Sequence, residues 1–157
     1  MAKDIKTLLL VEDDSLLAMT ETRWLSKAGY KVIHVPTGEK AVDTVKSNKD
    51  EIDLILMDIN LGSGIDGTEA AREILCENDI PLLFLSSHTE KEVVEKTEKI
   101  TSYGYVVKDS KEVVLLASIK MAFKLFNANK ALREKEKALL ESQARLKRAE
   151  FVSQAGN

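Results

Sequence analysis

Two stretches, Leu-Leu-Leu-Val-Glu-Asp-Asp at 8–14 and Asp-Leu-Ile-Leu-Met-Asp at 53–58, place acidic residues at the end of an apolar run. Strand-like apolar runs recur along the chain, separated by segments of helical character, at 7–11, 31–35, 53–57, 81–86 and 105–107. Such alternation predicts an α/β fold with a parallel sheet. The three runs within 8–11, 54–57 and 82–85 are continuously apolar, so we expect central strands covered by helices on both faces.

Helices are expected between these strands, because each intervening segment ends near a Gly, a Pro or a polar turn; the segments are 15–28, 38–47, 68–76 and 90–100. A further helix should begin near Lys111 and continue for over forty residues, because no Gly or Pro follows before Gly156. We therefore expect one domain over residues 1–126 and a C-terminal helical extension over 127–157.

The extension carries a leucine every seven residues, at Leu125, Leu132, Leu139 and Leu146. This spacing is typical of a coiled-coil seam, and Ala128 and Ala149 follow a leucine by three positions. Lys135 and Ser142 occupy the equivalent positions in the middle and suit a seam poorly. Two interpretations stay open: a coiled coil that dimerises the chain or links domains, and a solvated single helix.

Composition limits the class of protein. Hydrophobic residues make up 44% of the 157 residues and charged residues 31%, which is typical of a globular domain. The single cysteine, Cys76, cannot form an internal disulfide, and no apolar run approaches the roughly 18–20 residues of a membrane span, so we expect a cytoplasmic protein with no membrane segment. The net charge is −3 although the extension is basic, and such an acidic domain is not expected to bind nucleic acid directly.

Polar residues follow the predicted strands at the edge where ligands bind in open parallel sheets. Glu12 and Asp13 follow the first strand and Asp58 ends the third, so several carboxylates should crowd one edge. Like charges at close range must protonate or bind a cation, and Mg²⁺ favours such oxygen ligands. A plainer role as helix N-cap remains open for Asp14 or Ser15.

Three of these residues suggest phosphoryl transfer. Asp58 is placed to accept a phosphoryl group as an aspartyl phosphate. Lys108 ends the fifth strand and Ser86 the fourth, and they would supply a fixed cation and a hydroxyl donor to the phosphoryl oxygens. Each residue alone is weak evidence; the prediction depends on the complete set.

The motifs resemble those of response-regulator receiver domains of two-component signalling. The resemblance covers roughly residues 5–126 and is carried by residues 8–14, 53–61, Asp66-Gly67, 81–87 and 104–108. It implies a flavodoxin-like sheet of strand order 2-1-3-4-5 with an extended C-terminal helix. It also implies roles for individual residues: metal ligands Glu12, Asp13, Asp58 and the Asn60 carbonyl, phosphorylation at Asp58, and a switch formed by Ser86 and Tyr105.

The same resemblance implies partners and an output. A sensor histidine kinase or phosphotransfer protein would donate the phosphoryl group, and the fourth helix, fifth strand and fifth helix would present the changed surface. The tail is similar to linkers of hybrid histidine kinases, which leaves open a fragment of a larger regulator or a stand-alone receiver that forms a homodimer through its C-terminal helix. Asp109 replaces a frequent proline, so we expect a trans bond after Lys108.

Two other functions fit part of this pattern. An aspartyl-phosphate-forming hydrolase would also place a nucleophilic Asp after a strand, but it commonly needs a second Asp where this chain has Asn60. A non-phosphorylated scaffold of the same fold is disfavoured because every expected polar group is present. We therefore expect a phosphoacceptor rather than a turnover enzyme. His34 is expected to be structural, and His88 a solvent-facing loop residue.

Overall fold

The computed structural model describes the chain except residues 1–3, 88–90, 101–102 and 156–157. Five strands alternate with five helices, as the apolar runs predict. The strands are β1 (Thr7–Val11), β2 (Lys31–Val35), β3 (Leu54–Asp58), β4 (Leu82–Ser86) and β5 (Tyr105–Val107). The helices are α1 (Ser15–Lys27), α2 (Gly38–Asn48), α3 (Gly67–Glu77), α4 (Lys91–Ile100) and α5 (Glu112–Ala155). His88, and the residue at which the fourth helix was expected to begin, lie outside the described residues.

The strands form one parallel sheet in the order β2-β1-β3-β4-β5, which confirms the predicted flavodoxin-like fold. Every residue of β1, β3 and β4 is buried, because these strands lie in the interior of the sheet with helices over both faces. The register pairs Val11 with Met57 and Asp58 with Leu85. The ends of the three central strands therefore lie side by side.

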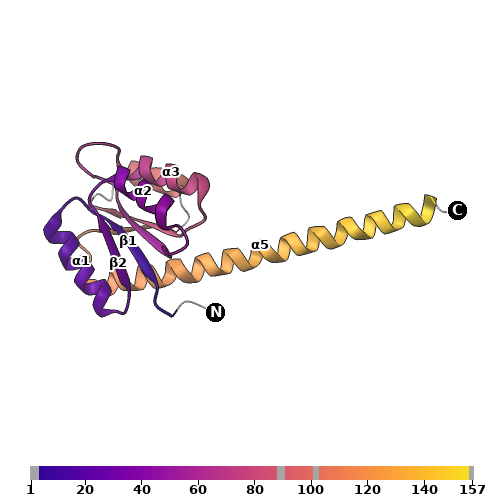
Figure 1. Ribbon diagram of the computed structural model, residues 1–157, viewed down its shortest axis with the longest axis horizontal. Helices are drawn as coiled ribbons and strands as arrows, with labels where there is room; N and C mark the ends of the chain where they lie inside the picture. The colour runs from indigo at the N-terminus through magenta and orange to yellow at the C-terminus, as the bar shows by residue number, and fades with distance from the viewer. Residues whose placement is uncertain (1–3, 88–90, 101–102, 156–157) are drawn as a thin grey trace. The chain divides into compact units, whose positions relative to one another are not determined.

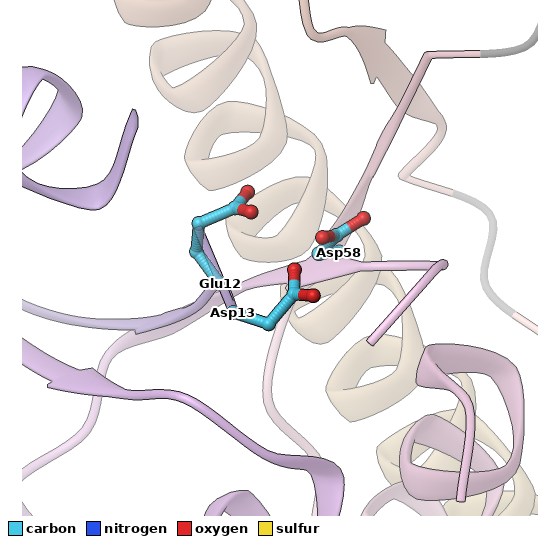
Figure 2. A group of neighbouring side chains, drawn as sticks. All are labelled: Glu12, Asp13 and Asp58. Carbon is cyan, nitrogen blue, oxygen red and sulfur yellow. The ribbon is translucent and has the colours of Figure 1, made fainter. Parts of the chain in front are cut away.

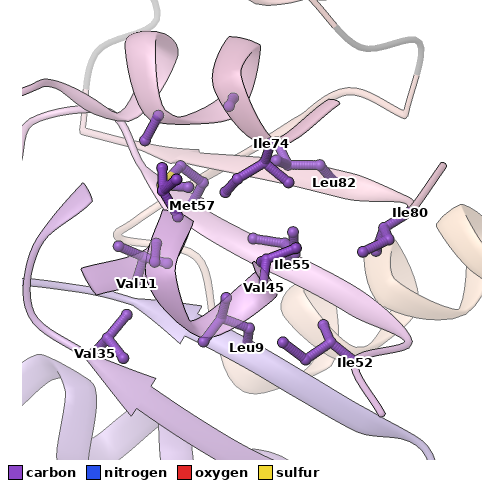
Figure 3. Packing of buried hydrophobic residues seen from close by; sticks show 14 of the residues in the cluster. Leu9, Val11, Val35, Val45, Ile52, Ile55, Met57, Ile74, Ile80 and Leu82 are labelled. Atoms are coloured by element: carbon purple, nitrogen blue, oxygen red, sulfur yellow. The ribbon is translucent and has the colours of Figure 1, made fainter. Parts of the chain in front are cut away.

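Alternate residues of each strand face opposite layers. One face packs with α2 and α3 around a cluster that includes Leu9, Ile55 and Ile74 (Figure 3). Phe84 belongs to the same cluster, and Ile100 of α4 packs against it. The other face packs with α1 and the first turns of α5 around Leu10, Leu56 and their neighbours. Helices α1 and α2 accordingly lie on opposite sides of the sheet (Figure 1).

Local sequence explains where the helices near the site begin and end. The Asp14 side chain accepts hydrogen bonds from the backbone N–H groups of Leu16 and Leu17, so Asp14 is the N-cap of α1. The Asp66 side chain caps α3 in the same way. Gly29, with φ of 99°, follows α1 in a conformation that favours glycine. The Lys108–Asp109 bond is trans, as predicted.

The chain divides into two compact units, Met1–Phe123 and Lys124–Asn157. The second unit is wholly helical up to Ala155 and forms the last part of the 44-residue helix α5. No helix in the described part of the chain combines the length and apolar character needed to span a bilayer.

Candidate functional site

Three acidic side chains converge at the carboxyl end of the sheet. Glu12 and Asp13 directly follow β1, and Asp58 is the last residue of the neighbouring strand β3. Each side chain offers a carboxylate oxygen, and these oxygens all lie within 4.8 Å of one another (Figure 2). Glu12 and Asp58 are buried, whereas Asp13 is exposed and faces solvent. The parallel register thus brings together the acidic residues that the sequence predicted.

A single lysine lies between the two buried carboxylates. Nζ of Lys108 donates a hydrogen bond of 2.7 Å to Oδ2 of Asp58 and one of 3.0 Å to Oε1 of Glu12. The backbone N–H of Lys108 donates to the Ser86 carbonyl at 2.9 Å, which continues the pairing of β4 with β5 beyond the last paired strand residue. Lys108 is therefore anchored at its backbone while its side chain reaches back to β3.

Burial dominates the electrostatics of this pocket. Desolvation raises the pKa of Asp58 to about 7, and the charge of Glu12 adds to this, although the hydrogen bond from Lys108 acts in the opposite direction. Burial would lower the pKa of Lys108, but its hydrogen bonds to Asp58 and Glu12 outweigh burial and the pKa is raised. Lys108 therefore stays charged at neutral pH, and burial opposes the ionisation of Asp58 while Lys108 favours it.

The donor set fits a hard divalent cation. Oε2 of Glu12 is buried and accepts no hydrogen bond from any described residue, although Nζ of Lys108 lies 3.0 Å away. The pocket holds three carboxylates, and the ammonium group of Lys108 pairs with two of them, Glu12 and Asp58, so acidic groups outnumber basic ones. Mg²⁺ prefers such oxygen ligands and keeps several waters, for which the exposed side of Asp13 leaves room. These residues could therefore hold Mg²⁺.

The backbone around Asp58 fixes its carboxylate. The N–H of Asn60 donates to Oδ1 of Asp58 at 3.1 Å, while Lys108 contacts Oδ2, so both oxygens are held. A Cβ at Gly67 would overlap the carbonyl oxygen of Asp58, so only glycine allows the start of α3 to approach β3 this closely. Nε2–H of His34 donates to the Glu12 carbonyl at 2.8 Å, a structural role for this histidine.

The two predicted switch residues lie on β4, which pairs with the strand of Asp58, and on β5, the next strand beyond β4. Ser86 is buried at the end of β4, one residue beyond Leu85, which pairs with Asp58. Tyr105 begins β5, is half-buried and packs against the core cluster on the side of α2 and α3. Ser86 therefore lies at the end of the sheet that carries Asp58, whereas Tyr105 lies one strand further away and pairs with Phe84.

One buried acid next to the pocket was not predicted. Glu21 lies on the inner side of α1 with an exposed fraction of 4%, and its Oε2 has no hydrogen-bond partner among the described residues. It lines a cavity of about 10 Å³ together with Trp24 and Lys108. Burial, and then the charge of Glu12, raise the pKa of Glu21 to about 7. In the sequence, Glu21 stands three residues after Ala18 and four residues before Leu25, so the three residues share one face of a helix, and this apolar face was the signal that could have indicated its burial.

A doubly covered parallel sheet with an acidic pocket at its carboxyl end defines a class of phosphoacceptor and nucleotide-binding folds. Within that class, a family model described as the response regulator receiver domain matches residues 8–120. The chain belongs to this family, whose members act as phosphoacceptors in signal transduction.

Individual relatives agree with this assignment. The chain is 29% identical over 135 residues to the uncharacterized transcriptional regulatory protein YrkP of Bacillus subtilis, covering 85% of this chain and 56% of that protein. It is 27% identical over 151 residues to the transcriptional regulatory protein PdtaR of Mycobacterium tuberculosis, covering 96% and 71%. The chain therefore spans little more than half of the first relative.

A solved structure shows the same fold at higher identity. The N-terminal domain of a response regulator/sensory box/GGDEF 3-domain protein from Carboxydothermus hydrogenoformans is 45% identical, with a TM-score of 0.73. The match covers 79% of this chain and 98% of that domain. The receiver fold of this chain thus has a counterpart at the start of a multidomain protein.

Proposed function

We propose that the chain accepts a phosphoryl group on Asp58 from a histidine kinase or phosphotransfer protein, in a Mg²⁺-dependent reaction. The observation that carries this proposal is the grouping of three carboxylates with oxygens within 4.8 Å of one another, one of which is the buried Asp58 that a lysine contacts at 2.7 Å. The proposal places the chain in the cytoplasm, where the ATP that supplies a histidine kinase is found.

The reaction requires an ionised, accessible carboxylate. A carboxylate oxygen of Asp58 attacks phosphorus, the bond from phosphorus to the donor's leaving group breaks, and the leaving group takes up a proton. Lys108 favours the ionised form of Asp58 against the effect of burial and reduces the repulsion that an anionic donor meets. The N–H of Asn60 holds the second oxygen, which fixes the plane of the carboxylate.

Glu12, Asp13 and Asp58, with the Asn60 carbonyl, would hold Mg²⁺. The bound ion supplies positive charge that offsets the charge of the phosphoryl oxygens. Buried Glu12 fits this role because one of its oxygens accepts no hydrogen bond from the described residues. Exposed Asp13 would leave that side of the site open to water and to the donor.

The response would begin at Ser86 and Tyr105. The Ser86 hydroxyl would donate to a phosphoryl oxygen, and Tyr105, half-buried on the adjacent strand, would turn inward into the space vacated. The surface of α4, β5 and α5 would then change, and α5 would carry the change into the extension beyond residue 126. We propose a phosphoacceptor rather than a turnover enzyme, because Asn60 stands where a hydrolase would need an acid.

Phosphorylation of the acceptor tests this proposal. Wild type, Asp58→Asn and Asp13→Asn are incubated with acetyl phosphate in Mg²⁺ or in chelator, with Asp43→Asn, an exposed aspartate of α2, as the matched control. We expect hydroxylamine-sensitive label in wild type and Asp43→Asn only when Mg²⁺ is present, weaker label in Asp13→Asn, and none in Asp58→Asn. Label that survives in Asp58→Asn, or that forms equally well in chelator, contradicts the proposal.

A further inference from the structure

The helical unit Lys124–Asn157 exposes a regular row of leucines. Leu125, Leu132, Leu139 and Leu146 are 41%, 56%, 60% and 62% exposed, respectively, although they recur at a spacing that keeps them on one stripe of the helix. Isolated leucines on a surface need no explanation, but a stripe of four in a 44-residue helix does. Covering the stripe would remove this apolar surface from water.

We propose that a second copy of this chain covers the leucine stripe, and that the two helices form a parallel, in-register, two-stranded coiled coil. In this arrangement each leucine meets its own counterpart, which gives four leucine layers. Alternate layers are formed by the residues three positions after each leucine, namely Ala128, Lys135, Ser142 and Ala149. The alanines at both ends let the backbones approach closely.

The flanking charges favour the parallel orientation. Parallel helices bring the residue before each leucine of one copy near the residue five positions later in the other copy. Arg145 then meets Glu150 of the second copy, and the pair occurs twice by symmetry. In the antiparallel orientation each flank packs against the same flank of the other copy, so Arg145 loses its glutamate partner. Its own flank holds no acidic residue, because the residues before the four leucines are Lys124, Ala131, Ala138 and Arg145.

The polar layers favour two strands and a modest affinity. Lys135 can bury its methylene groups in the seam and extend its ammonium group to water beside a two-stranded coil, whereas a third helix would block that path. Polar seam residues of this kind specify register and number of strands at a cost in stability. Replacing Lys135 by leucine should therefore tighten the dimer by about tenfold or more, because it adds an apolar layer.

The mass of the full chain tests the dimer. Sedimentation equilibrium from micromolar to millimolar concentration should show wild type shifting from the 17.5 kDa chain toward twice that mass. Leu132→Glu/Leu139→Glu should remain monomeric, whereas Leu140→Glu, which changes an equally exposed leucine outside the stripe, should dimerise like wild type. Far-UV circular dichroism verifies that the helix is retained. Three outcomes would overturn the proposal. They are a wild type and a Lys135→Leu variant that both stay monomeric, a trimer, and equal loss of dimer in Leu132→Glu/Leu139→Glu and in Leu140→Glu.

Disulfide trapping tests the orientation. In a Cys76→Ser background, Leu146→Cys should cross-link under mild oxidation, because its counterpart is the nearest residue in a parallel pair. An antiparallel pair of this stripe would separate the two residues by many residues of helix. Ala144→Cys, on the outer face, is the matched control and should not cross-link. A dimer that fails to cross-link at residue 146, or that cross-links as readily at residue 144, contradicts the parallel register. Neither experiment depends on phosphorylation, so its failure leaves the proposed role of Asp58 intact.

Discussion

Replacing Glu21 by glutamine should stabilise the protein at alkaline pH and leave it nearly unchanged at acidic pH. Glu21 is buried beside Glu12, Asp58 and Lys108, and its Oε2 has no hydrogen-bond partner among the described residues. Folding therefore raises its pKa from 4.5 to about 7. A neutral glutamine resembles the protonated acid, which is the form that the folded protein prefers.

The direction and size follow from linkage. Below pH 4.5 the acid is protonated in both the folded and the unfolded chain, so it adds no penalty. As the pH rises toward 7, the unfolded chain ionises freely while the folded chain resists, and stability falls. Above about pH 7 the full penalty is present, and one pKa unit corresponds to about 1.4 kcal/mol, so the shift amounts to about 3 kcal/mol.

Urea unfolding in chelator at pH 4.5, 6 and 8 measures this difference, since a bound cation would change the field at Glu21. We expect the gain from Glu21→Gln to grow from near zero at pH 4.5 to about 2–3 kcal/mol at pH 8. Glu73→Gln, at an exposed position of α3, makes the same change of charge and should show no such trend. A pH-independent effect of Glu21→Gln, or a loss of stability at pH 8, would refute the reasoning.

Three further changes probe the pocket. Lys108→Ala leaves Glu12 and Asp58 buried without a counter-charge, so it should lower the free energy of unfolding in urea by about 3–5 kcal/mol at pH 7 and by less at pH 5. Lys111→Ala, at an exposed position, is the control and should change the stability little. An equal loss of stability at both pH values would contradict this prediction. Gly67→Ala should lower the free energy of unfolding by about 1–3 kcal/mol and slow the labelling by acetyl phosphate, because the added Cβ would meet the Asp58 carbonyl. Unchanged stability and labelling would contradict this prediction. Mg²⁺ at about 100 times its Kd should raise the free energy of unfolding of wild type by about 2.7 kcal/mol. The same Mg²⁺ concentration should stabilise Asp13→Asn by clearly less, and equal stabilisation of the two proteins would exclude Asp13 as a ligand.

The sequence predicts the central strands well, because a strand that is buried on both faces is apolar at every position. The continuous apolar runs Leu8–Val11 and Leu54–Met57 correspond to the buried strands β1 and β3. The order of the strands came from the family resemblance, because the position of β2 beyond β1 depends on long-range packing rather than on local pattern. Where helix ends differ from expectation, they differ by one residue, as at α3, which begins at Gly67 rather than at residue 68.

The site was predictable only as a set. Acidic residues after two strands suggested a shared cation, but the contact of Lys108 with Asp58 joins residues fifty positions apart and depends on the side chain reaching past β4. Glu21 was missed because a glutamate in a helix is ordinarily solvated, and its burial becomes apparent only once α1 is packed on the sheet.

The phosphoryl-accepting residue can be located directly. Wild-type protein treated with acetyl phosphate and Mg²⁺ is reduced with borohydride, which traps an aspartyl phosphate, and its peptides are sequenced by mass spectrometry. The modification is predicted at Asp58 alone, with Asp13 and Glu12 unmodified. Modification at another residue, or a protein left unmodified with the metal present, would contradict the account.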